Sequence, residues 1–337
     1  MTARPGVVFL VPDGIDDAGR VSGGNVYDRH VRDGLRARGW TVTMAEASDG
    51  AGVASALRGV TDGALVLVDG LAAGWAPEEV DASSRRLRLV LLMHMSAAAF
   101  PDADDEVVAA ESRAVACAHR VIATSRWTAE QLVRRGLSTQ DRITVAPPGV
   151  VAAEVSAPDD DRRFLCVGVL APHKGQDTLL AALTRLREPA WSCTLVGSAE
   201  PYPEFAARLA DEARALGGRV ALTGVLTGER LDELYRRSAV LVAPSRVESA
   251  GMAVGEARGR GLPVVAAAAG GIPETVAGGG AILVRPGDAE ELAGALDSWM
   301  ADPRLRARLR REALAARERQ PRWDDTVTRV TDALEAA

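Results

Sequence analysis

Cysteine is scarce in this chain of 337 residues, and its three copies, Cys117, Cys166 and Cys193, lie far apart. They form no CxxC pair and show no metal-ligand spacing, which excludes a disulfide framework or a zinc site as the organising feature. No apolar run reaches the roughly 18 residues expected of a membrane-spanning helix. The run 7–11 is also too short for a signal segment. We therefore expect a cytoplasmic protein with reduced, buried thiols.

Excess positive charge is also missing, because the formal net charge is −6. This balance argues against nucleic acid as a partner. The basic run 304–311 contains Leu305 and Leu309 four residues apart, which favours a solvated amphipathic helix over a membrane-surface contact. No P-loop and no GxGxxG after the first strand is present, so an ATPase or a dehydrogenase has little support.

Short apolar runs alternate with helical patterns along the chain, which exceeds the length at which one core usually stops growing. The runs predict strands near 6–12, 40–45, 63–68, 86–94, 120–124, 142–146, 164–169, 192–197, 219–223, 239–243, 263–267 and 281–284. Short apolar strands separated by helices indicate parallel sheets covered on both faces. The fold class predicted is α/β, with two doubly wound Rossmann-like domains facing a central cleft.

The domain boundary is expected between 150 and 161, where prolines and an acidic run interrupt the alternation. We predict an N-terminal acceptor domain over 1–155, a C-terminal donor domain over 156–318 and a terminal helix over 319–337. Trp323, Val327, Val330 and Leu334 give that last helix one apolar stripe, headed by a tryptophan that we expect to be buried.

The segment 244–256 is the most informative part of the chain. It follows the apolar run 239–243 and predicts a turn and then a helix that starts near Gly251. The free amides at a helix start bind anions such as phosphate. Glu248 lies at the mouth of this site and Glu256 lies further into the helix. Carboxylates accept hydrogen bonds from sugar hydroxyls, so the pattern favours a nucleotide-sugar ligand.

This Glu-x7-Glu pattern, followed by Gly-Leu-Pro263 and by Gly270-Gly-Ile-Pro-Glu274, resembles the signature of retaining glycosyltransferases of family 4, which have the GT-B fold. The resemblance implies that Glu248 and the amides of Ser249, Ala250, Gly251 and Met252 face the transferred sugar and its phosphates. It implies that Glu256 binds the ribose hydroxyls. It further implies that the terminal helix crosses back onto the first domain.

Other segments complete the candidate site. His173 and Lys174 follow the first strand of the second half, where the family usually carries an Arg and a Lys that clamp the diphosphate. Lys174 matches that Lys, whereas Val169 stands at the Arg position, and His173 is the candidate to replace it in part.

In the first half, Gly23 and Gly24 open a helix, and paired glycines allow close approach of a ligand. The resemblance places them near the donor phosphates and the acceptor. His94 ends an apolar strand, and the family has a His there that contacts the transferred sugar. A histidine satisfied within the core is the alternative.

One motif points elsewhere. Asp102, Asp104 and Asp105 resemble the Asp-x-Asp metal motif of the other large glycosyltransferase fold, but their place before a helix favours a capping role. We therefore expect a retaining hexosyltransferase that needs no metal or other cofactor, with His94, Lys174 and Glu248 as its catalytic residues. Its partners would be a nucleoside-diphosphate sugar and a small soluble acceptor. A nucleotide-sugar epimerase-hydrolase and a non-catalytic nucleotide-sugar-binding protein remain the alternatives.

Overall fold

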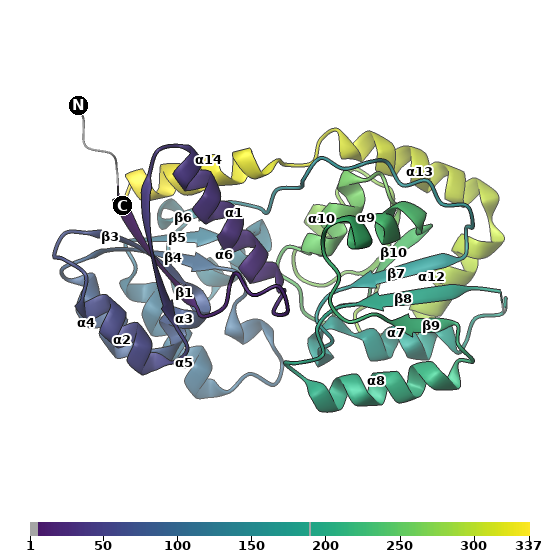
Figure 1. Cartoon of the computed structure of the whole chain (residues 1–337), viewed down its shortest axis with the longest axis horizontal. Coiled ribbons are helices and arrows are strands. Elements are labelled where there is room, and N and C mark those ends of the chain that lie inside the picture. Colours follow the sequence, from purple (N-terminus) through teal and green to yellow (C-terminus); the bar gives the residue numbers. More distant parts are fainter. Residues whose placement is uncertain (1–5, 189) are drawn as a thin grey trace. The chain divides into compact units, whose positions relative to one another are not determined.

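The computed structural model of the protein describes residues 6–188 and 190–337. The chain divides into two compact units. The first combines the described residues up to Gly149 with Pro321–Ala337, and the second is Val150–Gln320. Each unit contains one six-stranded parallel sheet between layers of helices (Figure 1). The α/β class predicted from the alternating pattern is therefore confirmed.

The sheet of the first unit has the strand order β2-β1-β3-β4-β5-β6. Its strands are β1 (Gly6–Pro12), β2 (Thr41–Ala47), β3 (Leu65–Asp69), β4 (Arg88–Met93), β5 (Arg120–Ala123) and β6 (Ile143–Val145). All five residues of β3 are buried, as expected of a central strand covered on both faces. The order reverses between β1 and β3, and such a reversal is where open α/β sheets bind ligands, at the carboxyl ends of the strands.

Helices cover both faces of this sheet. The elements are α1 (Gly23–Ala37), α2 (Gly50–Arg58), α3 (Gly70–Trp75), α4 (Pro77–Ser84), η1 (Ala97–Ala99), α5 (Asp105–Cys117), α6 (Arg126–Arg134), η2 (Gln140–Arg142) and α14 (Trp323–Glu335). The helices from α2 to α6 pack on one face. The other face is covered by α1 and α14, with Tyr27, Val31 and Leu35 of α1 buried as the sequence predicted.

The sheet of the second unit has the order β12-β11-β10-β7-β8-β9. Its strands are β7 (Arg163–Val167), β8 (Ser192–Val196), β9 (Val220–Leu222), β10 (Val240–Ala243), β11 (Val264–Ala267) and β12 (Ala281–Val284). Here the order reverses between β7 and β10, which are hydrogen-bonded neighbours. The ligand position expected for this sheet is therefore the carboxyl ends of β7 and β10.

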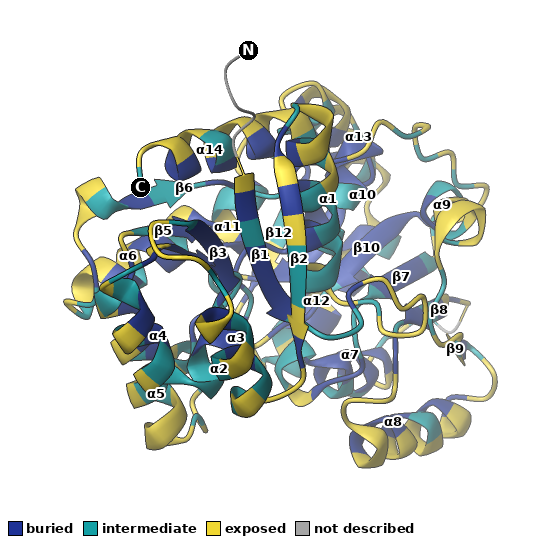
Figure 2. Cartoon of the chain, turned by 60° about the vertical axis from the view of Figure 1, so that its left-hand side comes forward, coloured by how far each residue is buried: buried dark blue, intermediate teal, exposed yellow. Residues whose placement is uncertain are grey.

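The helices of the second unit also form two layers. The elements are η3 (Pro172–Lys174), α7 (Gln176–Leu183), α8 (Pro203–Ala215), α9 (Gly228–Arg237), α10 (Met252–Gly259), α11 (Ile272–Thr275), α12 (Ala289–Ala301) and α13 (Pro303–Arg317). One core joins α7, α8 and α12 to the sheet around the fully buried Trp299. The other joins α9, α10 and α11. Figure 2 shows the buried strands in dark blue beneath the exposed faces of the helices.

The observed strands correspond to the predicted runs, with ends shifted by at most two residues. The first crossing between units lies after Gly149, six residues earlier than the predicted end of the first domain at 155. The segment beyond it packs on the second unit. Ser156 N donates to Arg260 O at 2.8 Å, and Arg317 Nη2 donates to Ala153 O at 2.8 Å. The return crossing follows Gln320, and the last helix begins only at Trp323.

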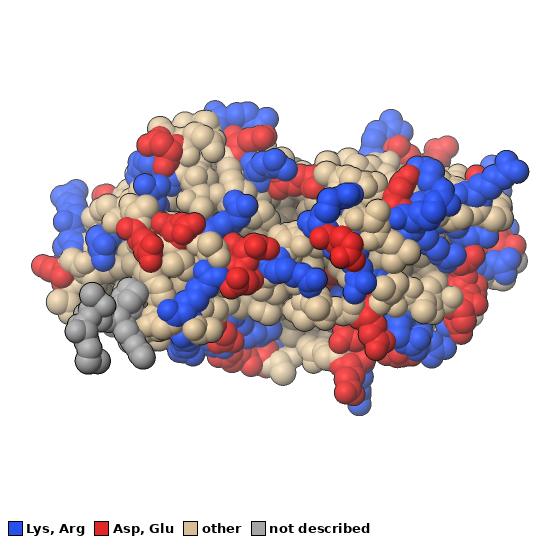
Figure 3. All heavy atoms as spheres, turned by 90° about the horizontal axis from the view of Figure 1, so that it is seen from above, with Lys and Arg blue, Asp and Glu red and all other residues tan. Residues whose placement is uncertain are grey.

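On the face seen in Figure 3, basic and acidic side chains are interspersed. Over residues 6–188 and 190–337, no helix is both long and apolar enough to cross a bilayer. Cys117, Cys166 and Cys193 are all free thiols, and the last two are buried.

Candidate functional site

The centre of the candidate site on the second unit is an ion pair between Lys174 and Glu248. Lys174 Nζ lies 2.6 Å from Glu248 Oε2. Lys174 follows β7 and Glu248 follows β10, so the topology alone brings these two residues together from 74 positions apart. Both side chains are largely buried, with exposures of 22% and 14%. The pair lies at the strand reversal where the sheet order predicts a ligand.

The charge of Glu248 is stabilised by its neighbours. Burial alone would raise the pKa of the Glu248 carboxyl, but the Lys174 ammonium and the backbone N–H of Gly251 outweigh burial and hold the pKa below its usual range. His173 adds a smaller effect in the same direction. Glu248 is therefore ionised at neutral pH, and both of its carboxylate oxygens are hydrogen-bond acceptors.

Two glycines allow the loops around this pair to approach closely. Gly270 has φ of +53°, and a Cβ there would lie 1.7 Å from the carbonyl oxygen of Glu248. Gly175 has φ of +69°, and a Cβ there would lie 2.2 Å from Pro244 O. Any larger residue at either position would force the backbone apart, because both conformations also disfavour a side chain. The Gly270-Gly271 pair of the sequence signature thus packs directly against the backbone of Glu248, and Gly271 N donates to Glu248 O at 3.2 Å.

Arg246 fastens the same two loops together, a role that the sequence reading missed. Its guanidinium makes a two-point ion pair with Asp177, at 2.8 and 2.9 Å, and donates to Pro172 O at 2.6 Å. Its backbone N–H donates to His173 O at 2.8 Å. Arg246 therefore holds the Lys174 loop against the Glu248 loop. An arginine three positions after a strand gives no sequence signal of its own.

Glu256 lies on α10, the helix predicted to start near Gly251. Gly251 is the residue before its first turn, with φ of +68°. The hydroxyl of Tyr235, which is fully buried on α9, donates to Glu256 Oε2 at 2.8 Å. Burial raises the pKa of the Glu256 carboxyl, and the Tyr235 hydrogen bond opposes that rise. Tyr235 was not predicted as a site residue, and it fixes the orientation of a carboxylate that was.

The remaining predicted donor residues lie around this centre. Ser249, Ala250 and Gly251 are buried between Glu248 and α10, and Met252 is the first residue of the helix. Thr275 Oγ1 donates to Ala250 O at 2.7 Å, which ties this loop to α11. His173 is half-buried, and its ring packs edge-on against Tyr202 with centroids 6.4 Å apart. Val169, which stands at the usual Arg position, accepts a hydrogen bond from Gln176 Nε2 through its carbonyl.

The predicted residues of the first unit also lie at a strand reversal. Ser22 caps α1, so Gly23 and Gly24 are the first helical residues, as predicted. A Cβ at Gly24 would lie 3.4 Å from His94 Cδ2, which places the second glycine in contact range of the imidazole. His94 follows β4 directly. Gly24 and His94 are thus brought together from elements 70 residues apart in sequence, whereas Gly23 is one position further from the ring.

His94 is held by two buried carboxylates that the sequence reading did not identify. Its Nε2 lies 2.8 Å from Asp28 Oδ1 and 3.2 Å from Asp69 Oδ2. Burial would lower the pKa of His94, but the charges and hydrogen bonds of the two carboxylates outweigh it and raise the pKa to about 10. Asp69 pairs in register with Leu92 of β4, so the strand order places it beside His94. The available sequence signal was a titratable residue at the end of each apolar run, since Asp69 ends β3 and His94 directly follows β4.

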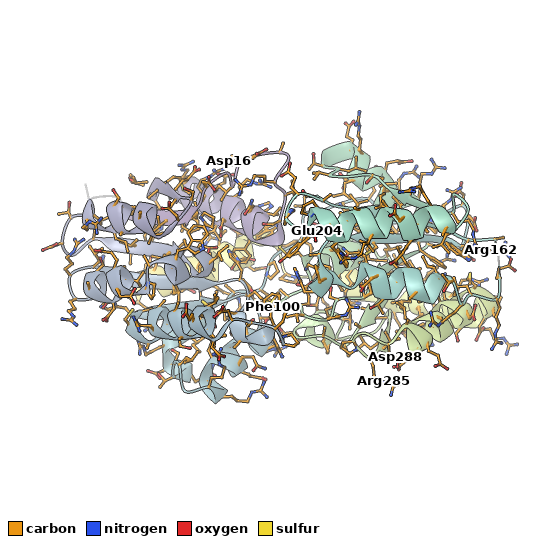
Figure 4. All side chains as sticks on the ribbon, turned by 90° about the horizontal axis from the view of Figure 1, so that it is seen from below. Asp16, Phe100, Arg162, Glu204, Arg285 and Asp288 are labelled. Atoms are coloured by element: carbon orange, nitrogen blue, oxygen red, sulfur yellow. The ribbon has the colours of Figure 1, made fainter. Side chains whose placement is uncertain are left out.

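The Asp-x-Asp segment caps a helix, as the favoured interpretation predicted. Asp104 is the N-cap residue of α5, and its Oδ1 accepts from Glu106 N at 2.7 Å. It follows the loop that carries Phe100, which Figure 4 labels together with Asp16 of the loop before α1. The buried Glu111 anchors that loop by accepting from Ala97 N at 2.6 Å.

Comparisons with known structures define the class of the fold. Sucrose-phosphate synthase (tll1590) from Thermosynechococcus elongatus superposes with a TM-score of 0.83 at 21% identity, over 99% of both chains. Anabaena Alr3699/HepE, solved in complex with UDP and glucose, superposes with a TM-score of 0.80 at 20% identity, over 99% of this chain and 100% of that one. The protein has the GT-B fold.

The sequence comparisons add a family for the second unit. Residues 152–315 match the family described as Glycosyl transferases group 1. Among curated relatives, a D-inositol 3-phosphate glycosyltransferase of Xylanimonas cellulosilytica is 33% identical over 246 residues, which is 67% of this chain and 58% of that protein. One from Acidothermus cellulolyticus is 35% identical over 65% of this chain and 54% of that protein. The aligned part thus spans little more than half the length of these relatives.

Proposed function

We propose that the protein is a glycosyltransferase that transfers a hexose-type sugar, with retention of configuration, from a nucleoside-diphosphate sugar to a small soluble acceptor. The Lys174–Glu248 pair at the reversal of the second sheet carries this proposal. The match to the glycosyl transferases group 1 family over residues 152–315 supports it. The signature that carries these residues resembles that of family 4, and this resemblance supports membership of that family as part of the proposal.

Each site residue has a role in this proposal. Lys174 and the first amides of α10 neutralise the charge that develops on the departing diphosphate. The ionised Glu248 accepts from hydroxyls of the transferred sugar, and Glu256 accepts from the ribose hydroxyls. His94, together with Gly23 and Gly24, contributes contacts from the first unit, and His173 adds partial positive charge near Glu248.

The proposed chemistry requires no protein nucleophile. The bond from the anomeric carbon to the leaving phosphate oxygen breaks, and the acceptor oxygen forms its bond on the same face. The acceptor proton passes to the leaving phosphate. The work of the protein is then orientation and electrostatic stabilisation, which are the large terms in such reactions.

The decisive experiment incubates purified protein with UDP, GDP, ADP and TDP sugars, with and without acceptors. Because Alr3699/HepE was solved with UDP-glucose and the curated relatives are named for D-inositol 3-phosphate, these two compounds come first. Two results together support the proposal. Release of nucleoside diphosphate depends on the acceptor, and NMR shows that the sugar in the product has the same anomeric configuration as in the donor. Rapid consumption of the donor alone would instead identify an epimerase-hydrolase, and binding without turnover would identify a binding protein.

Metal independence is a separate part of the proposal. Since Lys174 and helix amides are taken to neutralise the diphosphate, excess EDTA should leave turnover unchanged. Asp104→Ala should cost only the helix cap, about 1 kcal/mol of stability, and leave turnover intact. Activity that is lost with EDTA and restored by manganese would contradict this part.

We expect the protein to act in the cytoplasm.

A further inference from the structure

In the Asp28–His94–Asp69 cluster, two carboxylates contact a single imidazole nitrogen. The imidazole nitrogen and the carboxylate oxygens all lie within 4.8 Å of one another. Asp28 is 1% exposed and Asp69 is 3% exposed. A buried carboxylate without a cation or donor costs several kcal/mol. One neutral imidazole tautomer with its proton on Nδ1 would leave both carboxylates facing a lone pair.

A proton on Nε2 removes this conflict, because one N–H then serves Asp28 at 2.8 Å and Asp69 at 3.2 Å. Asp69 is fixed independently, since its Oδ1 accepts from Leu71 N and Ala72 N at the start of α3. The groups that face the imidazole from the surrounding elements are Asp28 and the edge-on ring of Tyr27, both from α1, and Asp69 from the end of β3. Asp28 and Asp69 both raise the pKa of His94, and the effect that opposes them is the burial of the imidazole.

The other ring nitrogen is left for a ligand. Among the described residues, Nδ1 of His94 has no hydrogen bond within the protein, and it is not among the fully buried polar atoms without a partner. The imidazole side chain is 19% exposed. A doubly protonated ring therefore presents one N–H donor outward while the two aspartates hold the other.

We propose that Asp28 and Asp69 are positioning residues that keep His94 an imidazolium, so that its Nδ1–H is a fixed donor to an oxygen of the substrate that binds the first unit and His94 does not act as a base. This inference rests on the proposed function for the identity of the ligand. Its protonation part stands on the structure alone. The inference thus gives two buried carboxylates of the first unit a role in the reaction, which is to hold His94 in its charged form.

The protonation part is tested by NMR of the histidine ring nitrogens in the ¹⁵N-labelled protein, without substrate. The chain has only four histidines, and His94→Gln identifies the signals of His94 by their loss. We expect both nitrogens of His94 to show imidazolium shifts from pH 6 to beyond pH 8. Asp28→Asn and Asp69→Asn should each lower the titration midpoint by about 1 to 3 pH units.

Asp33→Asn is the matched control, because Asp33 lies on the same helix but raises the pKa of His30. It should shift the midpoint of His30 and leave that of His94 unchanged. Circular dichroism establishes that each variant is folded. If Asp28→Asn does not fold, Asp69→Asn carries the test, since Asp69 lies at the end of a strand and is the more distant of the two carboxylates.

Three results would overturn the inference. The first is a neutral His94 ring at pH 7 in the unmodified protein. The second is an unchanged His94 midpoint in the folded Asn variants. The third is stoichiometric binding of Zn²⁺ or Mn²⁺ that removes the Nε2 proton, which would make the cluster a metal centre. None of these requires turnover, so they are independent of the proposed function.

The donor role is tested by the pH dependence of turnover. In the folded Asn variants, turnover should fall as pH rises through the lowered midpoint of His94, and it should recover at lower pH. A purely structural defect would lower turnover equally at all pH values, and that result would contradict the donor role. If no glycosyl transfer is found at all, the proposed function fails while the NMR result still decides the protonation state.

Discussion

At the residue scale, the hydroxyl of Tyr235 fixes the orientation of the Glu256 carboxylate. It occupies one oxygen of the carboxylate, at 2.8 Å, and leaves the other for a ligand. If Glu256 accepts from the ribose hydroxyls, Glu256→Ala should weaken nucleotide binding by about 2 to 4 kcal/mol, because hydrogen bonds to a charged acceptor are the stronger kind. Tyr235→Phe, which removes one neutral donor, should cost about 1 kcal/mol.

Isothermal titration with a nucleoside diphosphate measures both effects. Glu229→Ala is the control, because Glu229 is exposed on the first turn of α9, the helix that carries Tyr235. Nucleotide affinity equal to that of the unmodified protein in Glu256→Ala would disprove the ribose assignment.

Lys174 also matters for stability at this scale. Lys174→Met leaves the Glu248 carboxylate buried without its cation, which typically costs about 3 to 5 kcal/mol. The folded pKa of Glu248 is below its ordinary value, so the pair stabilises the fold above that ordinary value and the contribution is lost as pH falls through the folded pKa. The free energy of unfolding should therefore differ most between the two proteins at pH 7.

Urea denaturation across a pH series tests this dependence, and the difference should narrow towards pH 4. Arg285→Met, which removes a cation from the exposed pairs with Asp288 and Glu291, is the control and should change stability by less than about 1 kcal/mol (Figure 4). A difference that does not depend on pH would show that Lys174 contributes through packing and not through charge.

Sequence reasoning named both residues of the ion pair in the second unit, without predicting their contact, whereas in the first unit it named His94 but neither of its aspartate partners. Glu248 and Lys174 follow strands that both end in polar loops, so their positions were readable before the strand order was known. Asp28 lies beside the apolar stripe of α1, and only the folded helix shows that it points inward. Its partnership with Asp69 depends on β3 and β4 being neighbours, and a single sequence does not specify strand order.

At the element scale, α1 and α14 approach closely at one point. A Cβ at Gly34 would lie 2.4 Å from Val327 Cγ2. Gly34→Ala should therefore destabilise the first unit by about 1 to 3 kcal/mol, despite the better helix propensity of alanine. Thermal denaturation measures the loss, and adding Val327→Ala should recover part of it.

Gly74→Ala is the matched control, because Gly74 is also helical and has nothing within 4 Å of the added Cβ. It should be neutral or slightly stabilising. A double variant no more stable than Gly34→Ala alone would show that the cost arises elsewhere than in the contact between α1 and α14.

The elements themselves were predictable because buried parallel strands are short apolar runs. The boundary of the first unit was not, for a physical reason. Residues 150–157 belong to no helix or strand and have no periodic pattern, yet Val150 lies against α10, where a Cβ at Gly259 would be 3.2 Å from Val150 Cγ2. The two prolines at 147 and 148 mark the end of the first unit more closely than the acidic run at 159–161 does.

At the scale of the whole molecule, Trp323 stands where the chain returns to the first unit. It was expected to be buried but is half-buried, with its ring stacked on His30 at 3.9 Å. It also packs edge-on against Tyr27, which in turn packs edge-on against His94. Trp323→Ala should therefore lower turnover at least tenfold while nucleotide affinity changes little, because Lys174, Glu248 and Glu256, which are proposed to bind the nucleotide, belong to the second unit.

Steady-state kinetics and nucleotide titration on the same preparation separate the two effects. His30→Ala is the control, since it removes the stacked ring and leaves the contact between Trp323 and Tyr27 in place. It should retain most of the turnover. Equal loss of nucleotide affinity and turnover in Trp323→Ala would contradict the separation of roles between the units.

The discontinuity of the first unit has a consequence for biosynthesis. One face of its sheet is covered by α1 and by α14, and α14 is made last of all the helices described. A ribosome therefore releases residues 150–320, a continuous unit, before the first unit has the helix that completes its core. Domains usually fold as they emerge, from the N-terminus onward. Here the unit that begins first finishes last, and its half-covered sheet is the surface that a chaperone would meet on the nascent chain.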